Sequence, residues 1–313
     1  MNQHRIILAG GSGFLGRALA SHFQDAGHEV VILTRSPKPA SGSVREIVWD
    51  GRSLGDWAKD LEDATAVINL TGKSVNCRYT ARNRKEIIDS RVNSTRVIGE
   101  AIAKCNEPPR VWLNSSSATI YKHSFDKPMD ESCETGATPE AKDAFSIEVI
   151  EQWERELAEG QTPRTRKVAL RTSMVLGNAK NSVVPVLRRL ARFGLGGKMG
   201  SGKQMVSWIH EEDFCRAVEW IIAHENLSGH VNMTAPNPLP NREMMHAVRK
   251  VCSAPFGLPA TEWMLEVGAF FLRTETELII KSRNAIPRKL IESGFQFQFP
   301  VFQNALADLV DQT

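Results

Sequence analysis

Residues 5–16 read Arg5-Ile6-Ile7-Leu8-Ala9-Gly10-Gly11-Ser12-Gly13-Phe14-Leu15-Gly16. The apolar run predicts a buried strand, and the residues at 17–26 predict a helix directly after the glycines. Three of the glycines are spaced Gly-x-x-Gly-x-x-Gly between these two elements. A strand, a glycine turn and a helix in this order form the context in which such a turn binds a dinucleotide. The stretch therefore favours a nucleotide site over an ordinary glycine turn.

Each glycine has its own task in such a loop. Gly10 can adopt the positive φ of a tight turn, Gly13 lets the backbone approach a pyrophosphate, and Gly16 lets the helix pack closely on the strand. The helix N-terminus adds unbonded N–H groups and partial positive charge. The cofactor contacts predicted from this loop are Gly10, Ser12, Gly13, Phe14, Leu15 and Gly16.

The end of the second predicted strand, 29–35, bears on which dinucleotide is bound. An acidic residue about 20 positions after the loop usually binds the ribose 2′-hydroxyl of NAD, whereas arginine can pair with the 2′-phosphate of NADP. This chain has Arg35 and no acidic residue there, so NADP(H) is favoured over NAD(H). The alternative is that Arg35 is only a solvated strand end. A further strand ends in Leu70, Thr71 and Gly72, a turn past which the cofactor could run.

Composition sets limits on the kind of protein. The chain has 313 residues, 42% of them hydrophobic and 24% charged, as in ordinary globular proteins. Its net charge of +3 is too small to indicate nucleic acid as a partner. The five cysteines are scattered without a C-x-x-C pair, so no metal site or disulfide framework is expected. With no signal peptide and no apolar run near about 18 residues, we expect a cytoplasmic protein without a membrane partner.

Strands and helices alternate through residues 1–175, which predicts an α/β fold with a parallel sheet covered by helices on both faces. The pattern changes after that point. A glycine-rich stretch at 194–204 predicts a mobile loop over a ligand, and the rest of the chain is mainly helical. The alternating apolar residues at 294–297 indicate an added edge strand.

Several further motifs together are more specific than the glycine loop. They are Asn69-Leu70-Thr71-Gly72, Ser90-Arg91, Ser117-Ala118, Arg171-Thr172, Gly196-Gly197, Gly200-Ser201-Gly202, Ser207-Trp208-Ile209-His210 with Asp213, Asn232, Ala235-Pro236-Asn237-Pro238 and Pro287-Arg288-Lys289-Leu290. With these motifs the chain resembles the extended short-chain dehydrogenase/reductase superfamily. More narrowly, it is similar to the nucleoside-diphosphate-sugar epimerase-like proteins that carry a small C-terminal domain of uncharacterised role. The similarity runs through nearly the whole chain.

The resemblance implies a Rossmann doubly wound parallel sheet that binds NADP(H), with a smaller, mostly helical lobe holding the substrate against it. The Rossmann domain would comprise residues 1–175, with 206–234 returning to it, and the lobe residues 176–205 and 235–313. In the superfamily, hydride moves between nicotinamide and a carbinol carbon. A tyrosine in Y-x-x-x-K exchanges the proton, and a serine, matched here by Ser117, orients the substrate oxygen.

The tyrosine and lysine of that apparatus are missing. The chain has two tyrosines, Tyr79 and Tyr121, and neither is followed by lysine four residues later. On the helix where the motif should stand, Phe145 and Val149 occupy the two key positions. Neither side chain can exchange a proton, so the sequence separates binding the cofactor from using it.

Two functional hypotheses remain open. In the first, the protein is an NADP(H)-dependent epimerase or oxidoreductase that acts on an unidentified small molecule, with a sugar nucleotide as one option, and its proton donor has moved. Tyr121 is the leading candidate, and His210 and Glu131 are weaker ones. In the second, the protein is a non-catalytic NADP(H)-binding regulatory module that reports cofactor occupancy.

A set of polar residues favours a small-molecule ligand over the regulatory hypothesis. These candidate substrate contacts are Arg78, Lys203, Gln204 and His210, next to Ser117. The cluster of Arg188, Arg189 and Arg192 has no aromatic stacking platform, so nucleic acid is not expected as a partner. A homodimer is suggested only by analogy with the superfamily.

Overall fold

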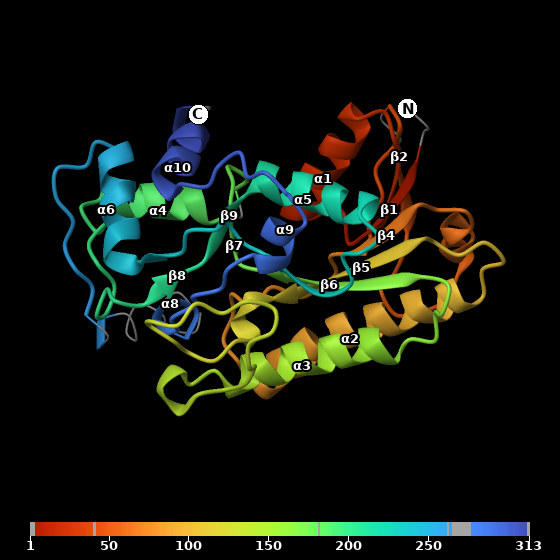
Figure 1. Ribbon diagram of the computed structural model, residues 1–313, viewed down its shortest axis with the longest axis horizontal. Coiled ribbons are helices and arrows are strands. Elements are labelled where there is room, and N and C mark those ends of the chain that lie inside the picture. Colours follow the sequence, from red (N-terminus) through yellow and green to blue (C-terminus); the bar gives the residue numbers. More distant parts are fainter. Residues whose placement is uncertain (1–3, 40–41, 181, 262, 265–276, 312–313) are drawn as a thin grey trace.

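The computed structural model describes residues 4–39, 42–180, 182–261, 263–264 and 277–311, and its largest element is a seven-stranded sheet (Figure 1). The strands are β1 (Arg5–Ala9), β2 (Glu29–Thr34), β3 (Val44–Val48), β4 (Ala66–Asn69), β5 (Val111–Ser117), β6 (Arg166–Thr172) and β10 (Gly229–Met233). All neighbours are parallel, in the order β10-β6-β5-β4-β1-β2-β3. This is the Rossmann strand order, so the predicted doubly wound parallel sheet is confirmed.

Helices cover both faces of the sheet (Figure 1). They are α1 (Phe14–Asp25) and α5 (Glu211–Ala223) on one face, and α2 (Ala81–Ala103) and α3 (Ala144–Glu159) on the other. The alternation of β1 shows why. Ile6 and Leu8 join the core beneath α1 and α5, whereas Ile7 and Ala9 face the opposite core with α2. A parallel strand buried on both faces is therefore apolar at every position.

A second hydrophobic core lies beside the sheet and forms the C-terminal lobe, at the left of Figure 1. Its elements are α4 (Val183–Arg192), α6 (Asn241–Val251) and α10 (Phe302–Asp311), with the strand pairs β7 (Met174–Leu176) and β9 (Trp208–His210), and β8 (Met205–Val206) and β11 (Leu239–Pro240). Short helices complete the description: α8 (Glu277–Ile280), α9 (Arg288–Glu292), and the 3-10 turns η1 (Asp56–Leu61), η2 (Ala118–Ile120) and η3 (Pro139–Ala141). Between the lobe segments the chain returns to the sheet as α5 and β10.

One local prediction was wrong. Residues 294–297 form no strand, because the buried Phe295 side chain packs into the core beneath α5, with its ring centroid 5.9 Å from that of Trp220. The glycine-rich stretch pairs with a neighbouring loop: Gly197 N–H donates to the Leu258 carbonyl and Gly200 N–H to the Ala260 carbonyl, at 3.2 and 2.8 Å. Its mobility over a ligand stays a prediction. None of the helices in the described ranges is long and apolar enough to cross a bilayer.

Candidate functional site

The three glycines of the loop differ in the space around them. Gly10 has φ +74°, and an added Cβ would lie 2.8 Å from the Thr71 hydroxyl oxygen. A Cβ at Gly16 would lie 2.3 Å from the Gly11 Cα, so this glycine brings α1 against the turn. At Gly13 the nearest atom would be the Gly10 carbonyl oxygen, 3.8 Å away. Only Gly13 faces open space, as a close approach by a ligand requires.

The neighbouring turn at 70–72 is held by hydrogen bonds on its buried side. The side-chain oxygen of buried Asn69 accepts a hydrogen bond from the Thr71 N–H at 3.1 Å, and its side-chain amide donates to the Asn114 side-chain oxygen at 2.8 Å. Arg91 donates to the Lys73 carbonyl at 3.0 Å. Burial lowers the pKa of Arg91 to about 10. These bonds give the turn one conformation beside the glycine loop, so Arg91 positions this turn from behind.

The two turns open into one cavity of about 710 Å³ at the carboxyl ends of β1, β2 and β4. Seven of the predicted cofactor contacts line it: Gly10, Ser12, Gly13, Arg35, Leu70, Thr71 and Gly72. The other three, Phe14, Leu15 and Gly16, form the first turn of α1 behind the loop. The structure thus brings two turns that are far apart in sequence into one cavity at the position where Rossmann folds bind ligands.

Two arginines line this cavity, and the sequence predicted only one of them. Arg35 follows β2 and Arg52 follows the neighbouring strand β3, and both are exposed. Within the described part of the chain, neither guanidinium has a hydrogen-bond or ion-pair partner. The nearby Asp50 carboxylate pairs with neither guanidinium, because it accepts the backbone N–H groups of Arg52 and Ser53. Arg52 could have been anticipated, since the carboxyl ends of neighbouring parallel strands meet at one edge.

The Thr71 hydroxyl gives a separate sign that the cavity suits a polar ligand. Its oxygen is buried and has no hydrogen-bond partner among the residues that the structure describes. Buried hydroxyls are normally bonded, and an orphan is expected where a ligand completes the set. The start of α1 carries no acidic residue and no side-chain cap, so its N-terminal N–H groups remain available to an anion. The residues present fit a dinucleotide.

The predicted reaction centre lies at the end of β5. Ser117 is half-buried, and its hydroxyl accepts the Thr119 N–H at 3.2 Å. Phe145 and Val149, at the positions of the missing motif, are buried in a small apolar cluster with Ile87. The helix therefore offers packing where the superfamily has its proton-exchanging pair.

Tyr121 lies inside the protein, with a side chain only 2% exposed. Its hydroxyl donates to the Asn232 side-chain oxygen at 2.8 Å and accepts from Arg171 at 3.1 Å. Burial raises the pKa of the phenol, while the Arg171 charge acts in the opposite direction. These contacts join the residue after η2 to β6 and β10. They favour a structural task, and the assignment of Tyr121 as proton donor stays a prediction.

We expect Tyr121→Phe to lower the free energy of unfolding by about 1–3 kcal/mol, because Arg171 and Asn232 each lose a buried partner. Urea denaturation of wild type and variant measures the difference. NADPH should still raise the melting temperature of the variant, since the phenol does not line the cavity. An unchanged free energy of unfolding would contradict the structural task.

The candidate substrate contacts do not gather in this cavity. His210 is buried, caps α5 by accepting the Glu212 N–H at 3.1 Å, and stacks on Phe299, and burial lowers its pKa. Gln204 is buried and donates to the Met199 carbonyl at 2.9 Å. Lys203 is exposed on the glycine-rich stretch, and Arg78 precedes α2. The four assignments as substrate contacts therefore stay predictions.

Glu131, the weaker candidate for proton donor, is also committed to the backbone. Its carboxylate accepts the Asn232 N–H at 2.9 Å, and burial raises its pKa. In the ranges that the structure describes, no group of three or more His, Cys, Asp or Glu side chains is placed to hold a metal ion.

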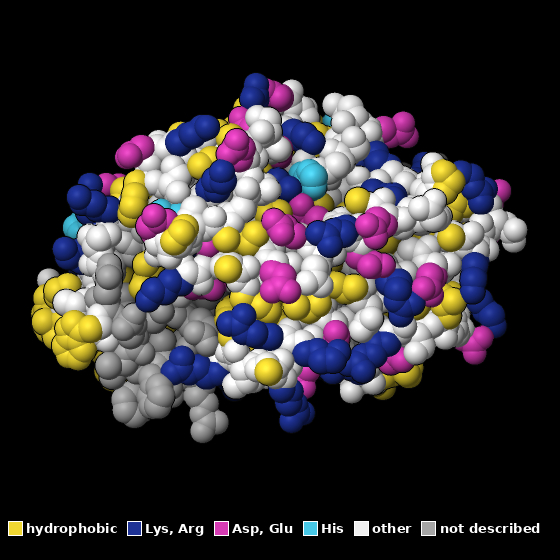
Figure 2. Space-filling model, turned by 90° about the horizontal axis from the view of Figure 1, so that it is seen from below, with side chains coloured by type: hydrophobic (Ala, Val, Ile, Leu, Met, Phe, Trp, Pro, Cys, Tyr) yellow, Lys and Arg dark blue, Asp and Glu magenta, His cyan; other side chains and the backbone are white. Residues whose placement is uncertain are grey.

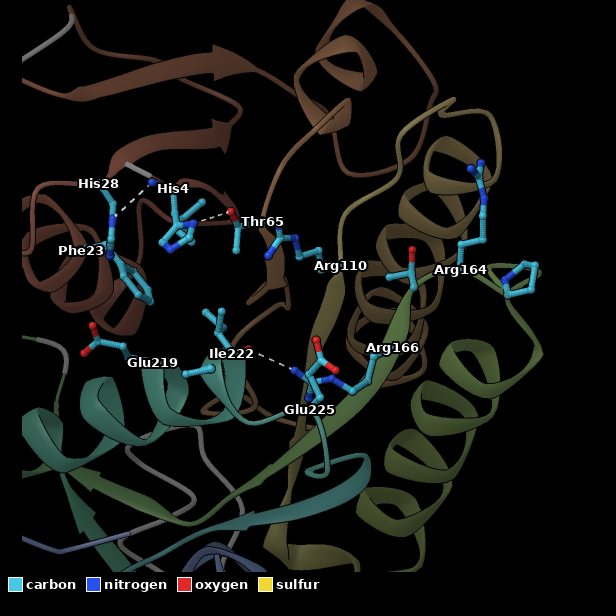
Figure 3. A pocket seen from close by; sticks show the side chains of 14 residues that line it. His4, Phe23, His28, Thr65, Arg110, Arg164, Arg166, Glu219, Ile222 and Glu225 are labelled. Atoms are coloured by element: carbon cyan, nitrogen blue, oxygen red, sulfur yellow. Dashed lines mark hydrogen bonds between the residues drawn. The ribbon is translucent and has the colours of Figure 1, made fainter. Parts of the chain in front are cut away.

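A larger hollow of about 1000 Å³ lies at the opposite, amino ends of the strands (Figure 3). Two of its arginines donate hydrogen bonds to carbonyl groups at the C-terminal ends of helices. Arg166 donates to the Ile221 carbonyl of α5, and Arg164 donates to the Cys105 carbonyl after α2, both at 2.9 Å. Helix C-termini carry partial negative charge, which these arginines offset. This hollow is remote from both turns of the cofactor cavity, and we assign it a structural origin.

Comparisons with known proteins agree with this geometry. Residues 6–233 match the NAD dependent epimerase/dehydratase family, and residues 260–309 match a domain of unknown function, DUF1731. The chain is 30% identical to the epimerase family protein YfhF of Bacillus subtilis over 97% of both chains. It is 28% identical to the human epimerase family protein SDR39U1, over 98% of this chain and 99% of that protein. The crystal structure of human SDR39U1 (isoform 2) with NADPH superposes with a TM-score of 0.86 at 27% identity, covering 99% of this chain and 100% of that one.

Proposed function

Because the chain belongs to the NAD dependent epimerase/dehydratase family, we propose that it binds NADP(H) and acts with it on a small molecule, as an epimerase or oxidoreductase. The observation that carries the cofactor proposal is the cavity in front of Gly13, which is lined by Arg35 and Arg52, two arginines whose guanidinium groups have no partner among the described residues. Two positive charges without partners suit the phosphate that distinguishes NADP from NAD. The relative solved with NADPH supports the same cofactor.

The proposed binding residues divide by the part of the cofactor that they would contact. The backbone at Ser12 and Gly13 and the N-terminal turn of α1 would bind the pyrophosphate. Arg35 and Arg52 would bind the 2′-phosphate, and the Thr71 hydroxyl would gain its missing hydrogen bond. When bound, the nicotinamide supplies hydride exchange. Ser117 would orient the substrate oxygen at the end of β5.

We expect Arg35→Ala and Arg52→Ala each to weaken NADPH binding and to leave NADH binding nearly unchanged. A charged hydrogen bond contributes about 1.5–3 kcal/mol, so NADPH affinity should fall by about ten- to a hundredfold. Fluorescence titrations with both cofactors measure the two dissociation constants. Arg110→Ala is the matched control, because Arg110 is exposed in the opposite hollow. Equal losses for NADPH and NADH would remove the 2′-phosphate role.

A second candidate function is supported by the packing of Phe145 and Val149. Because these side chains fill an apolar cluster, α3 has no group that exchanges a proton at the usual place. A protein built in this way could bind NADPH and signal its occupancy without turnover. Under this alternative, the NADPH and NADH titrations of the wild type and of the arginine variants would give the same results as for an enzyme.

Turnover distinguishes the two functions. Sugar nucleotides are incubated with the protein and NADP+, and small carbonyl compounds with the protein and NADPH. Product formation and the change in NADPH absorbance are both followed. We propose that one compound is converted, and that Tyr121→Phe tests the moved proton donor. A loss of about 100-fold or more in kcat would support Tyr121 as general acid. Conversion that is untouched by the substitution would exclude it, and the lack of any conversion would favour the regulatory module.

A further inference from the structure

Large apolar side chains are concentrated on one surface of the C-terminal lobe. We call this surface the lobe patch; its members are Val186, Phe193, Leu195, Phe256, Leu258, Trp263 and Met264. Phe193 is 72% exposed, Trp263 66% and Phe256 61%. Single exposed apolar residues are ordinary, but a contiguous group marks an interaction surface. Figure 2 shows hydrophobic and basic side chains together at its left end, the end that holds α4 and α6 in Figure 1.

Four of the members, Phe193, Leu195, Phe256 and Leu258, come together because two loops pair through their backbones. Leu258 N–H donates to the Gly194 carbonyl at 2.8 Å, and Gly197 N–H donates back to the Leu258 carbonyl at 3.2 Å. The Phe256 ring packs on Gly194, where an added Cβ would lie 2.9 Å from it. Phe193 and Leu195 therefore stand next to Phe256 and Leu258 on a rigid base. Their exposure is built into the fold.

Basic residues are concentrated in one segment of the lobe patch. Residues 183–204 contain five Lys and Arg and no Asp or Glu: Arg188, Arg189, Arg192, Lys198 and Lys203. Arg189, Arg192 and Lys198 are exposed. Arg188 and Arg192 are near enough to the Cys252 thiol to lower its pKa, against the larger effect of burial, which raises it. Arg249 donates to the Gly196 carbonyl at 2.6 Å and extends the positive charge to α6.

We propose that the lobe patch docks on an anionic membrane surface, with its aromatic side chains in the headgroup region and the surrounding cations on acidic lipids. Apolar insertion together with basic residues is the combination that attaches peripheral proteins to such surfaces. Trp263 is of the type that favours the membrane interface. A second copy of the chain is a poorer occupant, because it would bring an equally basic surface against this one.

This surface is invisible in the linear sequence. Its members come from the segments 186–195, 256–258 and 263–264, so no continuous apolar run in the sequence contains them all. The expectation that the protein has no membrane partner rested on such runs, which detect spanning segments only. Docking through a discontinuous patch needs no spanning helix.

Vesicle co-sedimentation tests the proposal directly. The full-length protein is mixed with vesicles of phosphatidylcholine alone, or of equal parts phosphatidylcholine and phosphatidylglycerol. We expect the protein to pellet with the anionic vesicles, to stay in solution with the neutral ones, and to be released as salt is raised. Failure to pellet with the anionic vesicles at low salt overturns the proposal.

Variants distinguish docking through the lobe patch from non-specific adsorption to vesicles. The double variant Phe256→Ser/Trp263→Ser should lower the partition coefficient by about tenfold or more, and Arg189→Glu/Arg192→Glu should do the same. Val48→Ser is the matched control, because Val48 is 66% exposed on the distant edge strand β3 and should bind like wild type. Each variant must keep the cooperative thermal unfolding of the wild type, which shows that it is folded.

Two further results would overturn the proposal. One is a double variant that pellets as wild type does. The other is a wild-type protein that sediments as a dimer without lipid and becomes a monomer in Phe256→Ser/Trp263→Ser, because the occupant would then be a second copy. The outcome is independent of the proposed function, since it requires no turnover.

Discussion

Gly13→Val is expected to abolish the stabilisation that NADPH gives the wild-type protein, while the cofactor-free variant melts close to the wild-type temperature. Gly13 has φ −77°, which any residue can adopt, and an added Cβ would meet only the Gly10 carbonyl oxygen at 3.8 Å. The valine would therefore fit the fold and occupy the space needed by a pyrophosphate. Ligand at a hundredfold excess over Kd contributes about 2.7 kcal/mol, several degrees in the melting temperature, and this shift should disappear.

Gly16→Val is the control that separates space for cofactor from space for the fold. Its Cβ would lie 2.3 Å from the Gly11 Cα and 2.4 Å from the Gly11 oxygen, both backbone atoms that cannot move aside cheaply. This variant should melt far below wild type even without NADPH. Thermal unfolding of both variants, with and without NADPH, gives the four melting temperatures that are compared. A full NADPH shift in Gly13→Val would show that the loop is only a turn.

Lys281→Met is expected to lower the free energy of unfolding by about 3–5 kcal/mol, because it leaves the Asp143 carboxylate buried without its cation. Both side chains are fully buried, and the Lys281 ammonium also donates to the Thr119 carbonyl. Burial lowers the pKa of Lys281, and the charge of Asp143 opposes that shift. The pair joins the segment after α8 to the start of α3, two residues from Phe145. Chemical denaturation measures the loss.

Two comparisons identify the cause of that loss. Lys281→Met/Asp143→Leu removes both charges and should recover a large part of the stability, since replacing a whole buried pair is often nearly neutral. Lys122→Met removes a surface pair with Glu134, in which the side chains are 45% and 83% exposed, and should cost less than about 1 kcal/mol. If Lys281→Met is as mild as Lys122→Met, the buried pair does not anchor this segment.

Where sequence prediction succeeded, the signal was local. The order of strand, glycines and helix at 5–16 predicted the first βα unit, and the cofactor turns followed from the ends of predicted strands. Where it failed, packing overrode the pattern. The alternation at 294–297 suits a strand, yet Phe295 packs its ring into the core beneath α5 and the segment joins no sheet. Arg52 was missed because its place beside Arg35 depends on which strands are neighbours.

The sequence by itself determined the Rossmann fold, its glycine loop, the leaning toward NADP(H) and the lack of a Tyr–Lys pair, since each depends on residues within a few positions. The tertiary structure alone decided that Tyr121 is enclosed by Arg171 and Asn232, and that the loop of Phe193 and Leu195 lies against the loop of Phe256 and Leu258 on the lobe. Local patterns fix strand and helix periods. Contacts such as Lys281 to Asp143, separated by 138 positions, exist only once the chain has closed on itself.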